Sequence, residues 1–448
     1  MIQTIRNAFT IPDLRKKILY TILIVFIFRI GTAIPVPFID AEALRQMMAT
    51  VTGANSGDNG NIISYLNMLS GRAFENATLF AMGIGPYITA QIIIQLLTVA
   101  IPPLEKLAKE GAEGRKKLNN IIRATTIGLG VFQGSMYYLM LKSNNVVFQY
   151  SNRWVNIFVT AFIVTCFCAG TALVMWLGEQ INKKGIGNGI SILLFTGIVA
   201  SGPKVFNTFR GWWEVATGGG DSSKGQPVYF FVIPAVCIAF LLIIWFIVFM
   251  QNSERKVPVQ YAKRVQGRKM VGGQKTFIPI KVNMSGVMPI IFASTIISVP
   301  ATVKMLVYKG QTYNTFWYKV WSIFDTNSLL YAFIYFLLII AFAYFYVTIQ
   351  YNPIEIANNL HKNNGAIPGI RPGKNTIAYL AKIINRITLI GALFLSVVAV
   401  LPIVISSFTK INISFGGTSV LILVGVALET VSQIESQMLM RHYKGFLE

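Results

Sequence analysis

Long runs of apolar residues recur along this chain, and each is about as long as a bilayer is thick. The first extends from Ile18 to Ile34, and similar runs follow as far as residue 434. A helix needs about 20 predominantly apolar residues to cross the hydrocarbon core. Only 12% of the residues are charged, whereas a soluble protein carries about a quarter. The sequence therefore predicts an all-α polytopic membrane protein.

The hydropathy pattern predicts ten transmembrane helices. The first run is too long for a signal peptide and lacks a small-residue cleavage pattern, so no cleaved leader is expected. The ten spans are expected at residues 18–34, 74–98, 120–141, 155–178, 186–206, 228–250, 281–304, 329–351, 383–406 and 415–434.

Basic residues set the expected orientation. If both termini are cytoplasmic, 27 of the 39 Lys and Arg residues lie in cytoplasmic segments and 11 in external ones, with Arg29 inside the first span. Positive charge favours the cytoplasmic side of a membrane protein. This bias predicts a multi-pass protein of the cytoplasmic membrane with both termini inside. The net charge of +22 is accordingly attributed to loops near anionic lipid.

Ten spans divide into two sets of five that enter the membrane from opposite sides. The expected halves are residues 1–206 and 228–448, joined by an external connection at 207–227. The second span of each half carries the pattern G-x-x-P-x-I, at Gly83–Ile88 and at Gly286–Ile291. Paired Gly/Pro-interrupted spans at matching positions point to a central pathway in an inverted repeat.

The pattern also predicts a depth for its isoleucines. Ile84 and Ile291 each stand ten residues into the expected span, which in a helix is about 15 Å into a core of about 30 Å. Both would lie near the midplane, beside a proline that loosens the helix. For any single isoleucine, ordinary packing or lipid contact is the simpler interpretation.

One short apolar segment, residues 61–71, precedes the second span and cannot cross a bilayer. A run of about ten residues is typical of an interfacial or a re-entrant piece, and a re-entrant piece must be buried in protein or line a cavity. A surface amphipathic helix explains the sequence equally well.

Residues suited to catalysis are scarce. Only two histidines occur, His361 and His442, and the three cysteines lie in apolar spans. The segment "GRKMVGGQKT" (267–276) lacks the spacing of a phosphate-binding loop. We expect no enzymatic activity, no cofactor and no metal. The ionisable residues within spans, Arg29, Glu179 and Glu429, form no obvious pair with one another and are expected to have structural or interfacial roles. Polar residues such as Thr89, Asn188 and Thr295 are expected to bond helix to helix.

Two expected cytoplasmic loops, 251–280 and 352–382, stand out. The first carries eight basic residues against one acid, Glu254, and in the second "GAIPGIRPGK" presents Arg371 between two turns. Such loops favour docking of an acidic or phosphate-rich partner. A basic loop that simply faces lipid headgroups is the alternative.

Three other protein classes fit less well. A secondary transporter would share the inverted repeat but should place charged or hydrogen-bonding groups at mid-depth, where this chain has isoleucine. A membrane enzyme needs a nucleophile or a metal site. A structural scaffold gives no reason for paired Gly/Pro spans at the midplane.

The chain resembles the SecY family of channel-forming translocon subunits in bacteria, over essentially its full length. The resemblance rests on the combination and order of several motifs. These are "FRIGTAIPVP" (28–37), "NMLSGRAF…LFAMGIGPYITAQIIIQLL" (67–97), "GIGNGISILLFTGIVA" (185–200), "VPVQYAKRV" (257–265), "IPIKVNMSGVMPIIFAS" (278–294), "NPIEIANNLHKNNGAIPGIRPGK" (352–374), "FGGTSVLILVGVALET" (415–430) and "RHYKGF" (441–446).

The resemblance implies a channel that conducts unfolded secretory polypeptides across the membrane and releases apolar segments sideways into lipid. It implies a pore ring of Ile84, Ile88, Ile190, Leu194, Ile291 and Ile422. It identifies 61–72 as a re-entrant plug, with Ile62, Ile63, Tyr65, Leu66, Met68, Leu69 and Arg72. It places the lateral gate between spans 2 and 7, at Gly83, Pro86, Gln91, Gln95, Gly286, Pro289 and Thr295.

The resemblance also implies partners. The SecA motor ATPase and the ribosome would dock on the two cytoplasmic loops, with Arg255, Lys256, Arg264, Arg268, Lys269, Arg371 and Lys374 as our chosen contacts. SecE and SecG would complete the complex, and preproteins with their signal peptides would pass through it. One departure concerns Gly85, where many relatives carry Met, and it predicts a looser gate helix.

Overall fold

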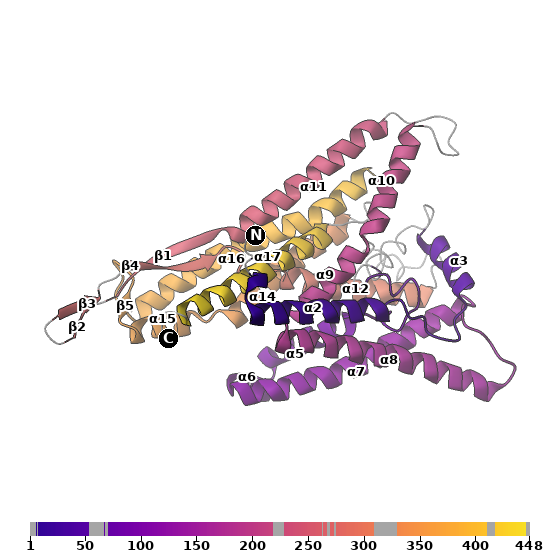
Figure 1. Cartoon of the computed structure of the whole chain (residues 1–448), viewed down its shortest axis with the longest axis horizontal. Coiled ribbons are helices and arrows are strands. Elements are labelled where there is room, and N and C mark those ends of the chain that lie inside the picture. The colour runs from indigo at the N-terminus through magenta and orange to yellow at the C-terminus, as the bar shows by residue number, and fades with distance from the viewer. Residues whose placement is uncertain are drawn as a thin grey trace.

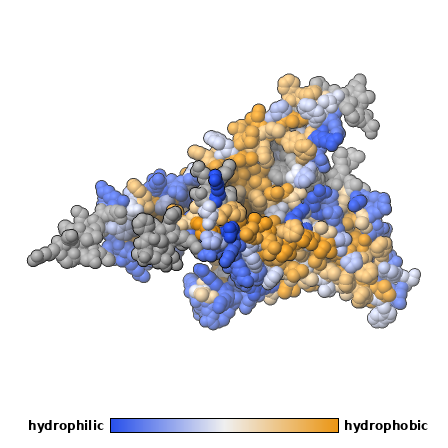
Figure 2. All heavy atoms as spheres, viewed as in Figure 1, coloured by the Kyte–Doolittle hydropathy of each residue, from blue (hydrophilic) through white to orange (hydrophobic). Residues whose placement is uncertain are grey.

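Figure 1 shows the computed structural model of the chain, a bundle of long helices with a strand ribbon projecting from one end. The structure describes all residues except 1–5, 7, 53–66, 68–69, 218–227, 262, 267–268, 273–274, 309–328, 410–416 and 445–448. In Figure 2, hydrophobic residues cover the region of the bundle around α2 and α11, and hydrophilic residues gather around α6 and toward the ribbon. This is the distribution expected of an all-α membrane protein.

Most of the described helices overlap the spans that the hydropathy pattern predicts, with shorter pieces between them. From residue 12 to 217 they are α2 (Pro12–Gly31), α3 (Ala41–Thr52), α5 (Gly85–Ala100), α6 (Pro102–Lys109), α7 (Ala112–Ser143), α8 (Arg153–Lys184), α9 (Gly189–Ala200) and α10 (Gly202–Thr217). From residue 228 onward they are α11 (Val228–Asn252), α12 (Met288–Tyr308), α14 (Leu329–Gln350), α15 (Pro353–Lys362), α16 (Lys374–Thr409) and α17 (Gly417–Lys444).

The number of helices that can cross a membrane is smaller than ten on length and composition alone. Within the described residues, five helices meet both requirements, and six do if α5 and α6, bent by 103° at their junction, form one span. Shorter apolar helices occur at Gly189–Ala200 and Met288–Ser298. The all-α membrane architecture is confirmed, whereas the count of ten spans is not.

The predicted second span, 74–98, is wrong in its first part. Residues 70–84 form turns, and helix α5 begins only at Gly85. Arg72, Ala77 and Gly83 have positive φ angles of 72°, 43° and 54°, which an α-helix does not contain. The backbone bonds outward instead, since Leu79 N donates to Ile34 O at 2.9 Å. The midplane depth predicted from a continuous helix fails here, and also for the seventh span, because α12 starts at Met288 rather than at residue 281.

The fifth predicted span also differs. Residues 189–217 form two helices, α9 and α10, that meet at Ser201. Helix α10 extends to Thr217, so much of the expected connection at 207–227 is helical, and the rest lies outside the described residues.

Eight helices contact one another in a closed circuit. The order of contacts is α5, α12, α14, α16, α17, α9, α8 and α7, and α7 returns to α5. The largest cluster of buried apolar side chains draws on most of these helices, including α5, α9, α12 and α17. The circuit therefore encloses an apolar centre to which helices from both ends of the sequence contribute.

The basic loop at 251–280 is a β-ribbon rather than an irregular loop. Strand β1 (Glu254–Tyr261) pairs antiparallel with β4 (Lys275–Lys281), and β2 (Lys263–Gln266) pairs with β3 (Lys269–Gly272). Strand β5 (Gly365–Ala366), from the second basic loop, pairs with Gln260 and Tyr261 of β1. The two loops thus form one sheet of order β4-β1-β5.

Two prolines protect the outer edges of this ribbon. Val282 N donates to Ser253 O at 2.9 Å, so these two residues form a hydrogen-bonded pair of the β1–β4 ladder. Such pairs alternate with non-hydrogen-bonded ones along an antiparallel ladder. Pro258 and Pro279 therefore fall at positions whose backbone nitrogens point away from the partner strand. Proline has no N–H to donate, so neither edge can extend through these positions. The ribbon can carry many exposed cations without exposing a continuous edge for aggregation.

Candidate pore and gate

The two G-x-x-P-x-I patterns mark the beginnings of two helices, not kinks within them. Gly83 and Gly286 adopt the left-handed conformation, with φ of 54° and 63°. Pro86 and Pro289 occupy the first turns of α5 and α12. Glycine reverses the chain at little cost, and proline fits the first turn because its missing N–H has no helical partner there. The pattern therefore marks the point where a non-helical segment ends and a helix begins.

This entry geometry directs isoleucines to the apolar centre. Ile84 and Ile88 are 3% and 4% exposed, and Ile291 on α12 is 4% exposed. Helix α5 lies against α12, so the two helices that these patterns begin are in contact. We call the contact between α5 and α12 the seam.

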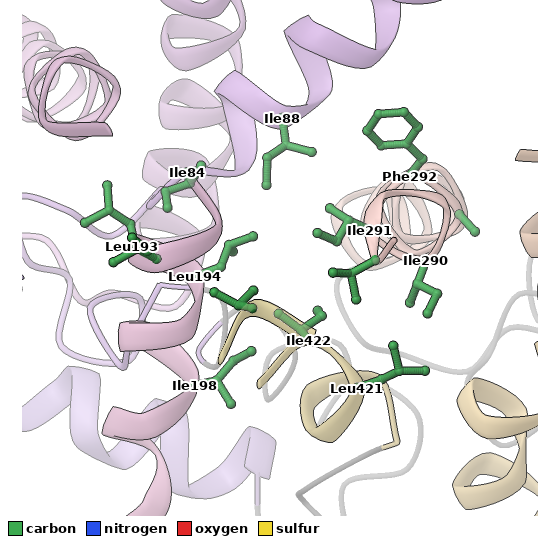
Figure 3. Close-up of a cluster of buried hydrophobic side chains, with 14 of the residues drawn as sticks. Ile84, Ile88, Leu193, Leu194, Ile198, Ile290, Ile291, Phe292, Leu421 and Ile422 are labelled. Atoms are coloured by element: carbon green, nitrogen blue, oxygen red, sulfur yellow. The ribbon is translucent and has the colours of Figure 1, made fainter. Parts of the chain in front are cut away.

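Two further helices complete the group. Helix α9 contributes Leu194 and α17 contributes Ile422, both almost fully buried. In Figure 3, the side chains of Ile88, Leu194, Ile291 and Ile422 point toward one another from their four helices. Ile190 is half-buried and packs against the same cluster. The structure thus brings the six predicted ring residues into one apolar cluster.

The start of α9 is fixed by a polar cap. The Asn188 side chain accepts a hydrogen bond from Ile190 N at 3.2 Å, which satisfies an N–H that the helix cannot pair. Asn188 therefore caps its own helix, and Thr89 and Thr295 donate to Gly85 O and Ile291 O of their own helices. The predicted bonding from helix to helix is wrong for these three residues. Gln91 and Gln95 on α5 are half-buried.

Sequence reasoning missed several members of the cluster. Leu193, Ile198, Ile290 and Leu421 are buried in the same cluster (Figure 3). Ile198 stands one helical turn after Leu194, so helix periodicity provides a signal for it. The other three neighbour ring residues in sequence, and only packing distinguishes them from lipid-facing positions.

The predicted plug falls mostly outside the described residues, which is where Ile62, Ile63, Tyr65, Leu66, Met68 and Leu69 lie. The part that is described contacts α2 and α9. Arg29 Nη1 donates to Gly71 O at 3.2 Å, and a Cβ on Gly71 would lie 3.2 Å from Gly197 Cα. Arg72 lies 3.7 Å from Glu75. Arg29 is thus bonded to the end of this segment rather than only facing the membrane.

The predicted docking cations lie on the ribbon and beside it. Arg255 and Lys256 on β1 are exposed, as are Arg371 and Lys374. Gly369 and Gly373 have φ of 80° and 106°, so the turn that presents Arg371 is flanked by left-handed glycines, as its sequence predicts. Arg264 and Lys269 are in strands β2 and β3, and Arg268 lies outside the described residues.

Comparison with known proteins decides the family. The SecY family model matches residues 78–431. The chain is 43% identical to a SecY protein translocase subunit of Streptomyces scabiei, with both chains covered in full. It is 40% identical to the one from Thermotoga maritima, over all of this chain and 98% of that one. The chain belongs to the SecY family.

Solved structures share the fold of this SecY-family chain. A structure described as a protein conducting channel has a TM-score of 0.64 at 18% identity, and the match covers 95% of this chain and 92% of that one. Sec61 from a canine ribosome–channel complex has a TM-score of 0.60 at 17% identity, over 95% and 92%. The curated relatives carry the name of a translocase subunit, and the family is one of multi-pass membrane proteins rather than catalytic enzymes.

One ion pair of this SecY-family chain was not predicted from the sequence. Arg123 on α7 donates from Nε and Nη2 to the two carboxylate oxygens of Glu179 on α8, at 2.6 and 2.5 Å. Lys183 Nζ lies 3.8 Å from the same carboxylate. Bidentate pairs of this kind are stronger than single contacts. The sequence conceals this pair because its members are 56 residues apart.

Gly286 and Gly85 offer a matched test of the helix-entry geometry. Neither has a heavy atom within 4 Å of the position where a Cβ would stand, but only Gly286 has a left-handed φ. Gly286→Ala should therefore lower the free energy of unfolding by about 1–2 kcal/mol, and Gly85→Ala should change it by less than about 0.5 kcal/mol. Denaturation of each purified variant in detergent, followed by tryptophan fluorescence, measures both values. Equal losses would show that backbone conformation is not the reason for glycine at 286.

Proposed function

We propose that this chain is the channel of a protein translocase, and that it passes unfolded secretory polypeptides across the cytoplasmic membrane. The supporting observation is the convergence of buried aliphatic side chains from α5, α9, α12 and α17 at the centre of a closed circuit of helices. A ring of aliphatic groups excludes water and ions when it is closed. Because it carries no fixed charge, it cannot trap a passing chain electrostatically.

In this proposal Ile84, Ile88, Ile190, Leu194, Ile291 and Ile422 form the pore ring, and residues 61–72 form a plug. The chain divides into halves at 1–206 and 228–448, with both termini in the cytoplasm. The seam between α5 and α12 opens to release apolar segments into lipid, with Gly83, Pro86, Gly286 and Pro289 at its helix starts and Gln91, Gln95 and Thr295 along it. The seam suits this role because it is one of the two places where the circuit passes from one half to the other, the second being the contact of α17 with α9.

The test is reconstitution with a SecE-type subunit and a SecA-type motor ATPase in lipid vesicles. Preprotein should become protected from external protease only when ATP is present and only in vesicles that contain this chain. Vesicles with the small subunit and the motor alone are the control. ATP-dependent protection that is equal with and without the chain would contradict the proposal.

We also propose that the ribbon and the 352–382 segment form the docking surface for SecA and the ribosome. The solved Sec61 neighbour comes from a ribosome–channel complex, and it shares this fold. The two segments form one unit here, because Val257 and Val259 of β1 pack with Leu360 of α15 and Leu380 of α16 in a separate buried cluster. This packing holds Arg255, Lys256, Arg371 and Lys374 on a single rigid base. SecE and SecG are proposed as the further membrane subunits.

Reversing two charges tests this surface. Arg255→Glu combined with Lys256→Glu should lower the affinity for a SecA-type motor by at least about tenfold at low salt, mainly by slowing association, and the loss should shrink as salt is added. Surface plasmon resonance on reconstituted nanodiscs measures the rates. Lys142→Glu, an exposed cation at the end of α7, is the matched control. An equal loss of affinity in the double variant and in Lys142→Glu would show a general effect of net charge and would contradict a docking surface on the ribbon.

A further inference from the structure

A second buried cluster joins the two halves away from the pore ring. Leu14 at the start of α2, Ile186 in the loop between α8 and α9, and Ile434 on α17 are 2%, 3% and 7% exposed. They form one cluster with Ala8, and Ile11, Ile18 and Met438 pack against it. It is separate from the cluster that contains the ring. Residues of both proposed halves therefore share a small core of their own.

Polar contacts reinforce this small core. Lys17 Nζ donates to Gln437 Oε1 at 3.3 Å, which bonds α2 to α17 directly. On the other side, Ile186 N donates to Thr21 Oγ1 at 3.1 Å, which bonds the loop to α2. The acceptor Gln437 is neutral, so this link does not depend on an ion pair that salt would screen.

Glycines at the loop between α8 and α9 allow it to pack very closely against its neighbours. A Cβ on Gly185 would lie 2.6 Å from Thr21 Oγ1, and one on Gly189 would lie 2.0 Å from Gly178 O of α8. Gly187 has φ of 87°, and a Cβ there would lie 2.7 Å from Ile192 Cδ1 and 3.4 Å from Thr430 Oγ1 of α17. Asn182 Oδ1 also accepts from Gly189 N at 2.7 Å. The loop is thus fixed to α2 and α8, and α17 rests on it.

These contacts differ in kind from the seam. The seam passes through the apolar cluster that contains the ring, whereas these contacts belong to a separate cluster. We propose that the start of α2, loop 185–188 and residues 430–438 of α17 form a pivot that stays closed while α5 and α12 separate. The pivot rests on the proposed function, because it presupposes that the seam opens.

Paired spin labels test the pivot. In a variant with Cys166, Cys168 and Cys237 replaced by serine, one pair of labels is placed at the exposed Lys16 and Ser436, beside the Lys17–Gln437 bond. A second pair is placed at Gln91 on α5 and Thr295 on α12. Electron–electron distances are measured in nanodiscs with the channel idle and with a preprotein stalled in it. The distance across the seam should lengthen, and the distance between residues 16 and 436 should stay unchanged.

Each other outcome has a definite meaning. If both distances lengthen, the halves separate as a whole and the pivot is wrong. If the seam distance stays constant in a channel that demonstrably holds a stalled chain, the lateral-gate part of the proposed function fails instead.

Disrupting the cluster provides an independent test. Ile434→Asp places a charge among buried apolar groups, and Gly187→Ala strains the loop backbone. Both variants should broaden the distance distribution between residues 16 and 436 at rest and slow transport severalfold. Gly128→Ala, on an exposed face of α7 with no atom within 4 Å of the new Cβ, is the control. Unchanged distances and rates in both variants would overturn the pivot, and the Gly187→Ala variant keeps the test valid if Ile434→Asp fails to fold.

Discussion

An idle channel in which Ile88, Ile291 and Ile422 are replaced by asparagine should leak ions far faster than the parent. Each of these side chains is at most 4% exposed and sits in the same apolar cluster. Burial of an aliphatic side chain is favoured by about 2 kcal/mol, and this preference opposes wetting of the ring. Since about 1.4 kcal/mol corresponds to a tenfold change in an equilibrium, each replacement should raise the wetted fraction, and with it the leak, by about 30-fold. Single-channel conductance in planar bilayers measures the leak directly.

The matched controls separate wetting from loss of packing. Ile88→Leu keeps the side chain apolar and of equal volume, so it should leave the channel tight. Asparagine at Leu241 and Leu242 on α11, which are 66% and 58% exposed, adds the same polar groups away from the ring and should also leave it tight. A tight triple variant would remove these residues from the ion barrier.

Cross-linking α5 to α12 should abolish lateral release of apolar segments. A thiol-reactive linker between cysteines at Gln91 and Thr295 would join the two sides of the seam, and a covalent bond cannot be displaced by the modest binding energy of a signal peptide. The three native cysteines are first replaced by serine. Membrane insertion of a model apolar segment, scored by carbonate extraction, should fall to background and should recover when a reducible linker is cleaved.

A linker elsewhere should have no such effect. Tyr138 on α7 and Thr160 on α8 lie 2.7 Å apart through their hydroxyls, and both belong to the first proposed half. Cysteines at these two positions control for modification and for rigidity within one half. If insertion continues across a fully cross-linked seam, apolar segments leave by another route.

The local sequence predicted most of the helices well, because long apolar runs leave few alternatives in a bilayer. It failed where tertiary hydrogen bonds replace helical ones. Residues 74–84 have a composition suited to a span, yet Tyr137 of α7 donates to Phe74 O at 2.6 Å, and a Cβ on Gly170 of α8 would lie 1.9 Å from Leu79 O. These partners are far away in sequence, so no periodicity reveals them.

The ring residues were predicted from the family resemblance, because nothing in the local sequence distinguishes a pore-lining isoleucine from any other buried isoleucine. The local sequence did contain the paired G-x-x-P-x-I pattern that starts at Gly83 and at Gly286. Its interpretation changed, because the glycines lie at helix entries rather than at midspan kinks. Gly85, for which the resemblance predicted a looser gate helix, begins α5 with open space around the position of a Cβ, and it lacks the left-handed conformation of Gly83 and Gly286.

The sequence by itself determined the membrane class, the positions of most of the apolar helices, the two patterns that begin α5 and α12, and the basic surface of the ribbon. These features follow from local composition and spacing, which the chain carries in any fold. Only the tertiary structure decided that α5 meets α12, that Arg123 pairs with Glu179, that β5 joins the ribbon, and that α17 rests on loop 185–188. Each of these contacts joins residues separated by dozens to hundreds of positions, and their energies depend on geometry that only the packed chain provides.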